Sequence, residues 1–141
     1  MDIRGRTIVL QWSVFSDSVT TQGTVMYKSF EDLEVWKRSC QVAVRVYEVL
    51  KESRDYGLRD QMQRAAVSIP SNIAEGSERG GKDFERFLRI ASGSVAELRT
   101  QCYIAVKVGL LTNETAMPIV NELKELSKMI TGLARSLKTE N

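Results

Sequence analysis

The side chains that enzymes use most often for proton transfer and metal binding are scarce in this chain. Its 141 residues include no histidine and only two cysteines, Cys40 and Cys102. Ser-His-Asp and Cys-His nucleophilic sites, His-ligated zinc sites and Glu-x-x-His di-iron sites all need histidine, and two thiolates cannot complete a four-cysteine metal site. Glu75, Glu85 and Glu97 offer carboxylates but follow no metal-ligand spacing. We therefore predict no catalytic residues, no metal and no cofactor, in a protein that is not an enzyme.

Basic residues are the candidates for contacts with phosphate groups, the main source of sequence-independent nucleic-acid affinity. They form two groups: Arg79, Lys82, Arg86 and Arg89, then Lys124, Lys128 and Arg135, which Lys138 extends. Acidic residues alternate with the first group, so a solvated face that pairs its own charges is the alternative interpretation. The net charge is only +2, far from the basic excess of a dedicated nucleic-acid-binding domain. Binding would therefore depend on an oligomer that repeats the patch by symmetry.

A proline inside a helical stretch marks a third candidate site. Pro70 removes one backbone hydrogen bond, and Asn72 and Glu75 bring polar groups to the kink that we expect there. Gly76 is expected to end the helix. These polar groups either contact a neighbouring subunit or ligand, or they satisfy the broken helix and cap its end. We favour the second interpretation, because buried polar groups normally need such partners.

Four stretches carry apolar residues at helical spacing. The first begins at Ser29, with Asp32 in a capping box, and the second follows a turn at 54–57. The third runs from about Lys82 to Val108, and the fourth begins near Thr112 or Thr115, with Pro118 favouring the later start or a kink. Long helices joined by short loops predict an all-α, up-down-up-down antiparallel four-helix bundle.

The first helix carries two apolar stripes. The stripe expected to face the core has a heptad-like spacing and consists of Leu33, Trp36, Cys40, Ala43, Tyr47 and Leu50. A second stripe lies beside it: Val35, Val42, Val46 and Val49. So wide an apolar face exceeds what a monomeric bundle needs. We predict that the valines form the interface of a homo-oligomer.

Residues 1–26 differ from the rest, because they are rich in Thr, Ser, Val and Gln and lack helical periodicity. Their short apolar run superficially resembles a signal peptide, but Gln11 and Ser13 interrupt it and no cleavage site follows. We predict a poorly ordered arm or a mis-assigned start, since Met26 could begin the chain, and a bundle domain over 27–141. No apolar run is long enough to span a membrane. A cytoplasmic location with reduced thiols is expected.

Several stretches resemble the four-helix proteins encoded within intervening sequences of bacterial 23S rRNA genes, also called S23 ribosomal or intervening-sequence proteins. The most specific is Ser68–Gly76, which is similar to the family signature Ser-Ile-Pro-x-Asn-Ile-Ala-Glu-Gly. The others are Phe30–Trp36, Phe87–Ser94, Glu97–Gln101 and Gly132–Leu137. The chain departs from the family pattern in its first 26 residues and at Pro118.

The resemblance implies a homopentamer, a ring of bundles around a channel. It extends to the accessory variability determinant proteins of diversity-generating retroelements, which share the bundle and bind nucleic acid and a reverse transcriptase. We therefore expect an oligomeric binding or scaffold protein that contacts RNA, DNA or a reverse transcriptase. The alternative is a protein-interaction adaptor without nucleic-acid binding, which would hold its partner in an apolar groove.

Overall fold

The computed structural model describes residues 29–139, and the predicted arm over 1–26 lies outside these residues. A short 3-10 helix, η1 (Phe30–Asp32), precedes four long helices. These are α2 (Glu34–Leu50), α3 (Tyr56–Arg79), α4 (Gly81–Lys107) and α5 (Asn113–Thr139). Residues 29–139 contain no strand, which confirms the prediction of an all-α fold with four helices.

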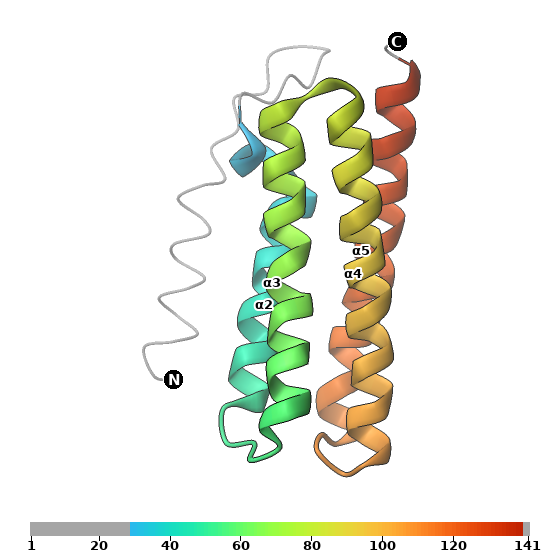
Figure 1. The fold of residues 1–141 in the computed structure, drawn as a ribbon. Coiled ribbons are helices and arrows are strands. Elements are labelled where there is room, and N and C mark those ends of the chain that lie inside the picture. Colours follow the sequence, from blue (N-terminus) through green and yellow to red (C-terminus); the bar gives the residue numbers. More distant parts are fainter. Residues whose placement is uncertain (1–28, 140–141) are drawn as a thin grey trace.

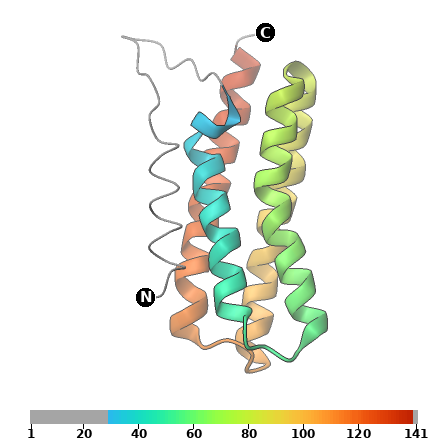
Figure 2. The same cartoon turned by 90° about the vertical axis from the view of Figure 1, so that its left-hand side faces the viewer.

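The helices lie side by side along most of their length (Figure 1). The α2–α3 and α4–α5 loops lie at one end, and the tight junction of α3 with α4 lies at the other end, near the end of α5 (Figure 1). Each helix packs against the next one in the chain, and α2 also packs against α5 (Figure 2). This closed arrangement lets every helix bury one face against two others.

The core is apolar and receives residues from all four helices. Its fully buried large side chains include Leu50, Met62, Ile69, Ile73, Phe84, Leu88, Leu98, Leu123 and Leu126. Burying one such side chain contributes about 1.5–3 kcal/mol relative to leaving it in water. The helical spacing of these residues in the sequence therefore accounts for the helices and for their association.

Side-chain caps fix where three of the elements begin. Ser29 and Asp32 form the predicted capping box, but they enclose only η1, and α2 begins after an extended residue, Leu33. The Asp55 carboxylate accepts a hydrogen bond from the backbone N–H of Leu58 at 3.1 Å, so α3 begins inside the predicted turn. The Thr112 hydroxyl accepts from the N–H of Thr115 at 3.2 Å. Helix α5 thus takes the earlier of its two predicted starts and continues through Pro118.

The valine stripe of α2 faces the inside of the bundle, which corrects its predicted position. Val35, Val42 and Val46 are only 5%, 4% and 0% exposed, and Val49 is half-buried against the core. Tyr47, which was expected in the core, is 48% exposed. Valines this deeply buried offer almost no surface to a second copy, so in this fold they pack the core instead of forming the predicted oligomer interface. Two adjacent apolar stripes leave the rotation of a helix ambiguous, and contacts with the other helices decide it.

Gly76 does not end a helix as predicted, because α3 continues to Arg79 and stops at Gly80, whose φ is +70°. Gly76 is buried instead, and a Cβ added there would lie 2.7 Å from the Cβ of Phe87. Its missing side chain lets α3 approach α4 closely. At no other helical glycine of the described residues would an added Cβ lie so close to a neighbouring atom.

Candidate functional site

Four of the seven cations predicted to contact phosphate are engaged in ion pairs on the surface. Arg79 pairs with Glu75 at 3.2 Å and Asp83 at 3.8 Å, Arg86 with Asp83 at 3.6 Å, Arg89 with Glu85 at 3.0 Å, and Lys128 with Glu125 at 3.5 Å. Lys82, Lys124 and Arg135 are exposed and form no ion pair within residues 29–139. Exposed pairs contribute only about 0–1 kcal/mol. A phosphate group can therefore compete for the paired cations.

The cations around the α3–α4 junction form a self-contained cluster. The guanidinium groups of Arg79 and Arg86 lie 5.2 Å and 4.7 Å from the ring centre of Phe87 and share the carboxylate of Asp83. Cation–π contacts and ion pairs together occupy both side chains. At this end of the bundle the structure supports the self-paired interpretation.

A groove between α4 and α5 brings the two predicted basic groups together. Arg89 of α4 and Arg135 of α5 line one cavity of about 290 Å³, and Lys138 lies beside them. Leu88, Ile130 and Ala134 form its apolar floor, and Ser92 and Thr131 add hydroxyl groups. We call this cavity the α4–α5 groove. Its residues come from the first half of α4 and the last turns of α5, so it lies toward the end of the bundle where α3 joins α4 and α5 ends.

Glu85 organises the rim of the groove. One of its carboxylate oxygens accepts from Arg89 at 3.0 Å and lies 3.4 Å from the Lys138 ammonium, so it links α4 to the end of α5. The hydrogen bond from Arg89 is the main reason why the pKa of Glu85 lies below its ordinary value. The spacing of Glu85 and Arg89 indicated their pairing, but nothing in the sequence indicated the link to Lys138.

The basic surface continues along α5. A neighbouring hollow of about 330 Å³ is lined by Ser127, Lys128, Thr131, Gly132 and Arg135, so it shares two residues with the groove. Lys124 lies one turn before Lys128 and lines neither cavity. We define the α4–α5 basic surface by five residues: Arg89, Lys124, Lys128, Arg135 and Lys138.

The polar residues of the proline motif are satisfied within the chain. The Asn72 side-chain amide donates to the Ser68 carbonyl at 2.7 Å and to its hydroxyl at 2.9 Å. That hydroxyl lies 2.8 Å from the hydroxyl of Ser94 on α4. Pro70 is buried inside a continuous α3, and Glu75 is occupied by Arg79. The motif thus joins α3 to α4 through Ser68 and Ser94, and its polar groups do not cap a helix end, because α3 continues to Arg79.

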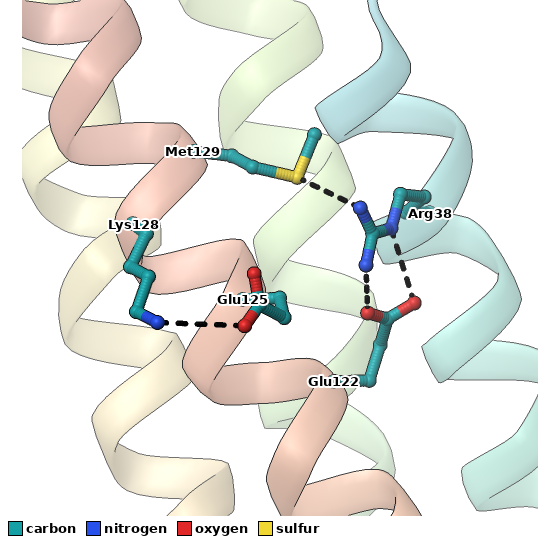
Figure 3. A network of polar contacts seen from close by, with 5 residues as sticks. All are labelled: Arg38, Glu122, Glu125, Lys128 and Met129. Carbon is teal, nitrogen blue, oxygen red and sulfur yellow. Dashed lines mark hydrogen bonds and ion pairs between the residues drawn. The ribbon is translucent and has the colours of Figure 1, made fainter.

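A second polar link, which the sequence did not indicate, joins α2 to α5 (Figure 3). Arg38 donates to both carboxylate oxygens of Glu122, with its Nε at 3.1 Å, and its Nη1 lies 3.4 Å from the Met129 sulfur. Both charged side chains are about one-third exposed. The hydrogen bond to Glu122 is the main cause of the raised pKa of Arg38. This contact lies away from the α4–α5 groove and links α2 to α5.

The described residues offer little to redox or metal chemistry. Burial raises the pKa of the Cys40 thiol to about 12 and that of Cys102 to about 11, so both are protonated at neutral pH. No three metal-binding side chains of residues 29–139 are grouped so that they could hold an ion. Nor does this part of the chain contain a helix with the length and apolar character to cross a membrane.

Comparisons with known proteins agree on one family. The family model described as 23S rRNA-intervening sequence protein matches residues 31–132. Comparison with curated proteins gives no match. Among solved structures, the chain is similar to a protein of unknown function from the S23 ribosomal protein family of Bacteroides thetaiotaomicron, whose crystal structure was determined at 1.70 Å resolution. The two share 26% sequence identity with a TM-score of 0.67, over 71% of this chain and 97% of that one.

Proposed function

Because the chain belongs to the family of 23S rRNA-intervening sequence proteins, we propose that it is a non-enzymatic binding or scaffold protein that contacts RNA or DNA. The observation that carries this proposal is the α4–α5 basic surface, where five cations from two helices face two carboxylates, Glu85 and Glu125. Such a surface attracts phosphate groups through charge, without reading the base sequence.

Self-association is the second part of the proposal. One copy has a net charge of only +2 and presents few phosphate contacts, so useful affinity needs the surface to be repeated. We propose an up-down-up-down antiparallel bundle that forms a homopentamer in the cytoplasm. Exposed apolar side chains on α3, on α4 and directly after α4 support subunit contacts, namely Val67, Ile90, Ile104 and Val108. They replace the buried valines of α2 as the interface that we propose.

The same apolar side chains favour a second candidate function. Ile104 and Val108 are 46% and 63% exposed, and a protein partner such as a reverse transcriptase could cover them instead of a second copy. The chain would then be an adaptor, with or without nucleic acid. Native mass spectrometry at near-physiological salt separates the two, because a pentamer gives five times the chain mass and the adaptor a monomer.

Fluorescence anisotropy with labelled RNA and DNA tests nucleic-acid binding. The variant combines Lys124→Gln, Lys128→Gln and Arg135→Gln, and the control removes three exposed cations at the opposite end: Lys51→Gln, Arg54→Gln and Lys107→Gln. We expect affinity to fall with salt and the variant to lower the log–log salt slope by about 2–3 per bound subunit, at roughly 0.7–0.9 for each contact. Equal losses in the variant and the control, or affinity that does not depend on salt, would disprove the proposed surface.

A further inference from the structure

We infer that the α4–α5 groove is a binding site for one nucleotide of a single-stranded nucleic acid, an inference that rests on the proposed function. The phosphate would lie against Arg135 at the rim, and the sugar and base would cover the apolar floor. Three features of the groove carry this assignment: its floor, the charges of its rim and its continuation along α5.

The floor favours a single strand over a duplex. Leu88 and Ile130 are buried and Ala134 is half-buried, so the apolar surface lies below the charged side chains that surround it. A duplex keeps its bases paired inside and offers only its phosphates to such a surface, whereas a single strand can turn a base toward it. The cavity of about 290 Å³ lies at the lower end of the range for ligand pockets and suits one nucleotide.

The rim of the groove carries three cations and one carboxylate, and this carboxylate pairs with only two of the cations. Glu85 holds Arg89 and Lys138, but Arg135 has no ion pair within the described residues. A guanidinium group binds a phosphate through two parallel hydrogen bonds, which suits Arg135 as the anchor. The hydroxyls of Ser92 and Thr131 can donate to or accept from the sugar or the base.

The groove continues into the neighbouring hollow along α5, so a bound strand could extend from the nucleotide-binding site along this helix. Arg135 and Thr131 also line the hollow that contains Lys128. Arg135 follows Lys128 by seven positions in the helix, which corresponds to about 10 Å along the axis. Lys128 can therefore reach a second phosphate of the same strand.

The test compares a labelled single-stranded oligo-U RNA with the same strand in a duplex with oligo-A, both measured by fluorescence anisotropy on the full chain. Ala134→Phe fills the floor without changing any charge, and Ala134→Leu is a smaller substitution in case the first one disturbs the fold. Ala96→Phe is the matched control, since Ala96 is exposed on α4 and lines no cavity described above. Arg135→Gln removes the anchor.

We expect both Ala134 variants to weaken single-strand binding at least fivefold while duplex binding and the Ala96→Phe control stay unchanged. Arg135→Gln should weaken the single strand about fivefold at 0.1 M salt and lower its salt slope by about 0.7, the value for one lost contact. Unchanged single-strand binding in both Ala134 variants would overturn the proposed nucleotide-binding site but leave the proposed basic surface intact. A wild-type chain that binds neither RNA form would overturn both.

Discussion

Replacing Gly76 by alanine tests how closely α3 and α4 are packed. The added Cβ would lie 2.7 Å from the Cβ of Phe87 and 3.1 Å and 3.3 Å from two atoms of Phe84. Neither Phe87 Cβ nor the Cα of Phe84 is the mobile end of a side chain, so the helices themselves must separate. The substitution therefore acts on the whole α3–α4 interface.

The size of the effect follows from two opposing contributions. Overpacking a well-filled core costs about 1–3 kcal/mol, and the rigid neighbours of Gly76 place it near the upper end of that range. Alanine in a helix interior is more favourable than glycine by about 1 kcal/mol. We expect Gly76→Ala to lower the free energy of unfolding by about 1–2 kcal/mol, which corresponds to a fall in Tm of about 4–8 °C.

Urea unfolding, followed by circular dichroism at a fixed protein concentration, measures the change. Gly93→Ala on α4 and Gly132→Ala on α5 are the matched controls, because an added Cβ meets no atom within 4 Å at either position. Both should gain up to about 1 kcal/mol from helix propensity. A Gly76→Ala variant as stable as these controls would refute the close approach of α3 to α4.

Three further changes test other contacts. Asn72→Ala removes two side-chain hydrogen bonds within α3 and should cost about 1–2 kcal/mol in urea unfolding, and a variant as stable as the wild type would show that these bonds contribute nothing. A double-mutant cycle with Arg38→Ala and Glu122→Ala should give a coupling of about 1 kcal/mol that weakens with salt, whereas zero coupling would contradict the bidentate pair. Cys40 and Cys102 should react with Ellman's reagent at pH 8 only after unfolding. Folding raises the pKa values of these two thiols from 9.0 to about 12 and 11, so the thiols lose their protons at lower pH in the unfolded chain than in the folded one. The free energy of unfolding should therefore fall as the pH rises above about 9. A free energy of unfolding that stays constant over this pH range would contradict the prediction.

Local sequence features predicted the elements but misplaced some of their ends. Apolar spacing located all four helices, and the Ser29 capping box is present as predicted. The ends of α3 were wrong because Asp55 caps the helix earlier than the turn residues suggested, and because Gly76 is needed for packing. A glycine in a sequence looks the same whether it ends a helix or makes room for a neighbour.

The candidate site could be predicted only as a set of cations. Helical spacing placed Lys124, Lys128 and Arg135 on one face of α5, yet their relation to Arg89 depends on how α4 and α5 are set against each other. The role of Glu85 as a link to Lys138 depends on that same placement. Side chains that are far apart in the sequence become one site through the register of packed helices, which local spacing does not encode.

The sequence alone determined the helical class, the four-helix count and, through Ser68–Gly76, the family to which the chain is similar. These depend on periodicity and on short motifs, which act within a few turns of the chain. Tertiary structure alone decided that Val35, Val42 and Val46 of α2 are buried while Tyr47 is exposed, and that Arg89 and Arg135 share a groove. The physical reason is that a helix with two adjacent apolar stripes can turn different parts of its wide apolar face toward the core. The contacts of α2 with α3 and α5 select the orientation that fills the core.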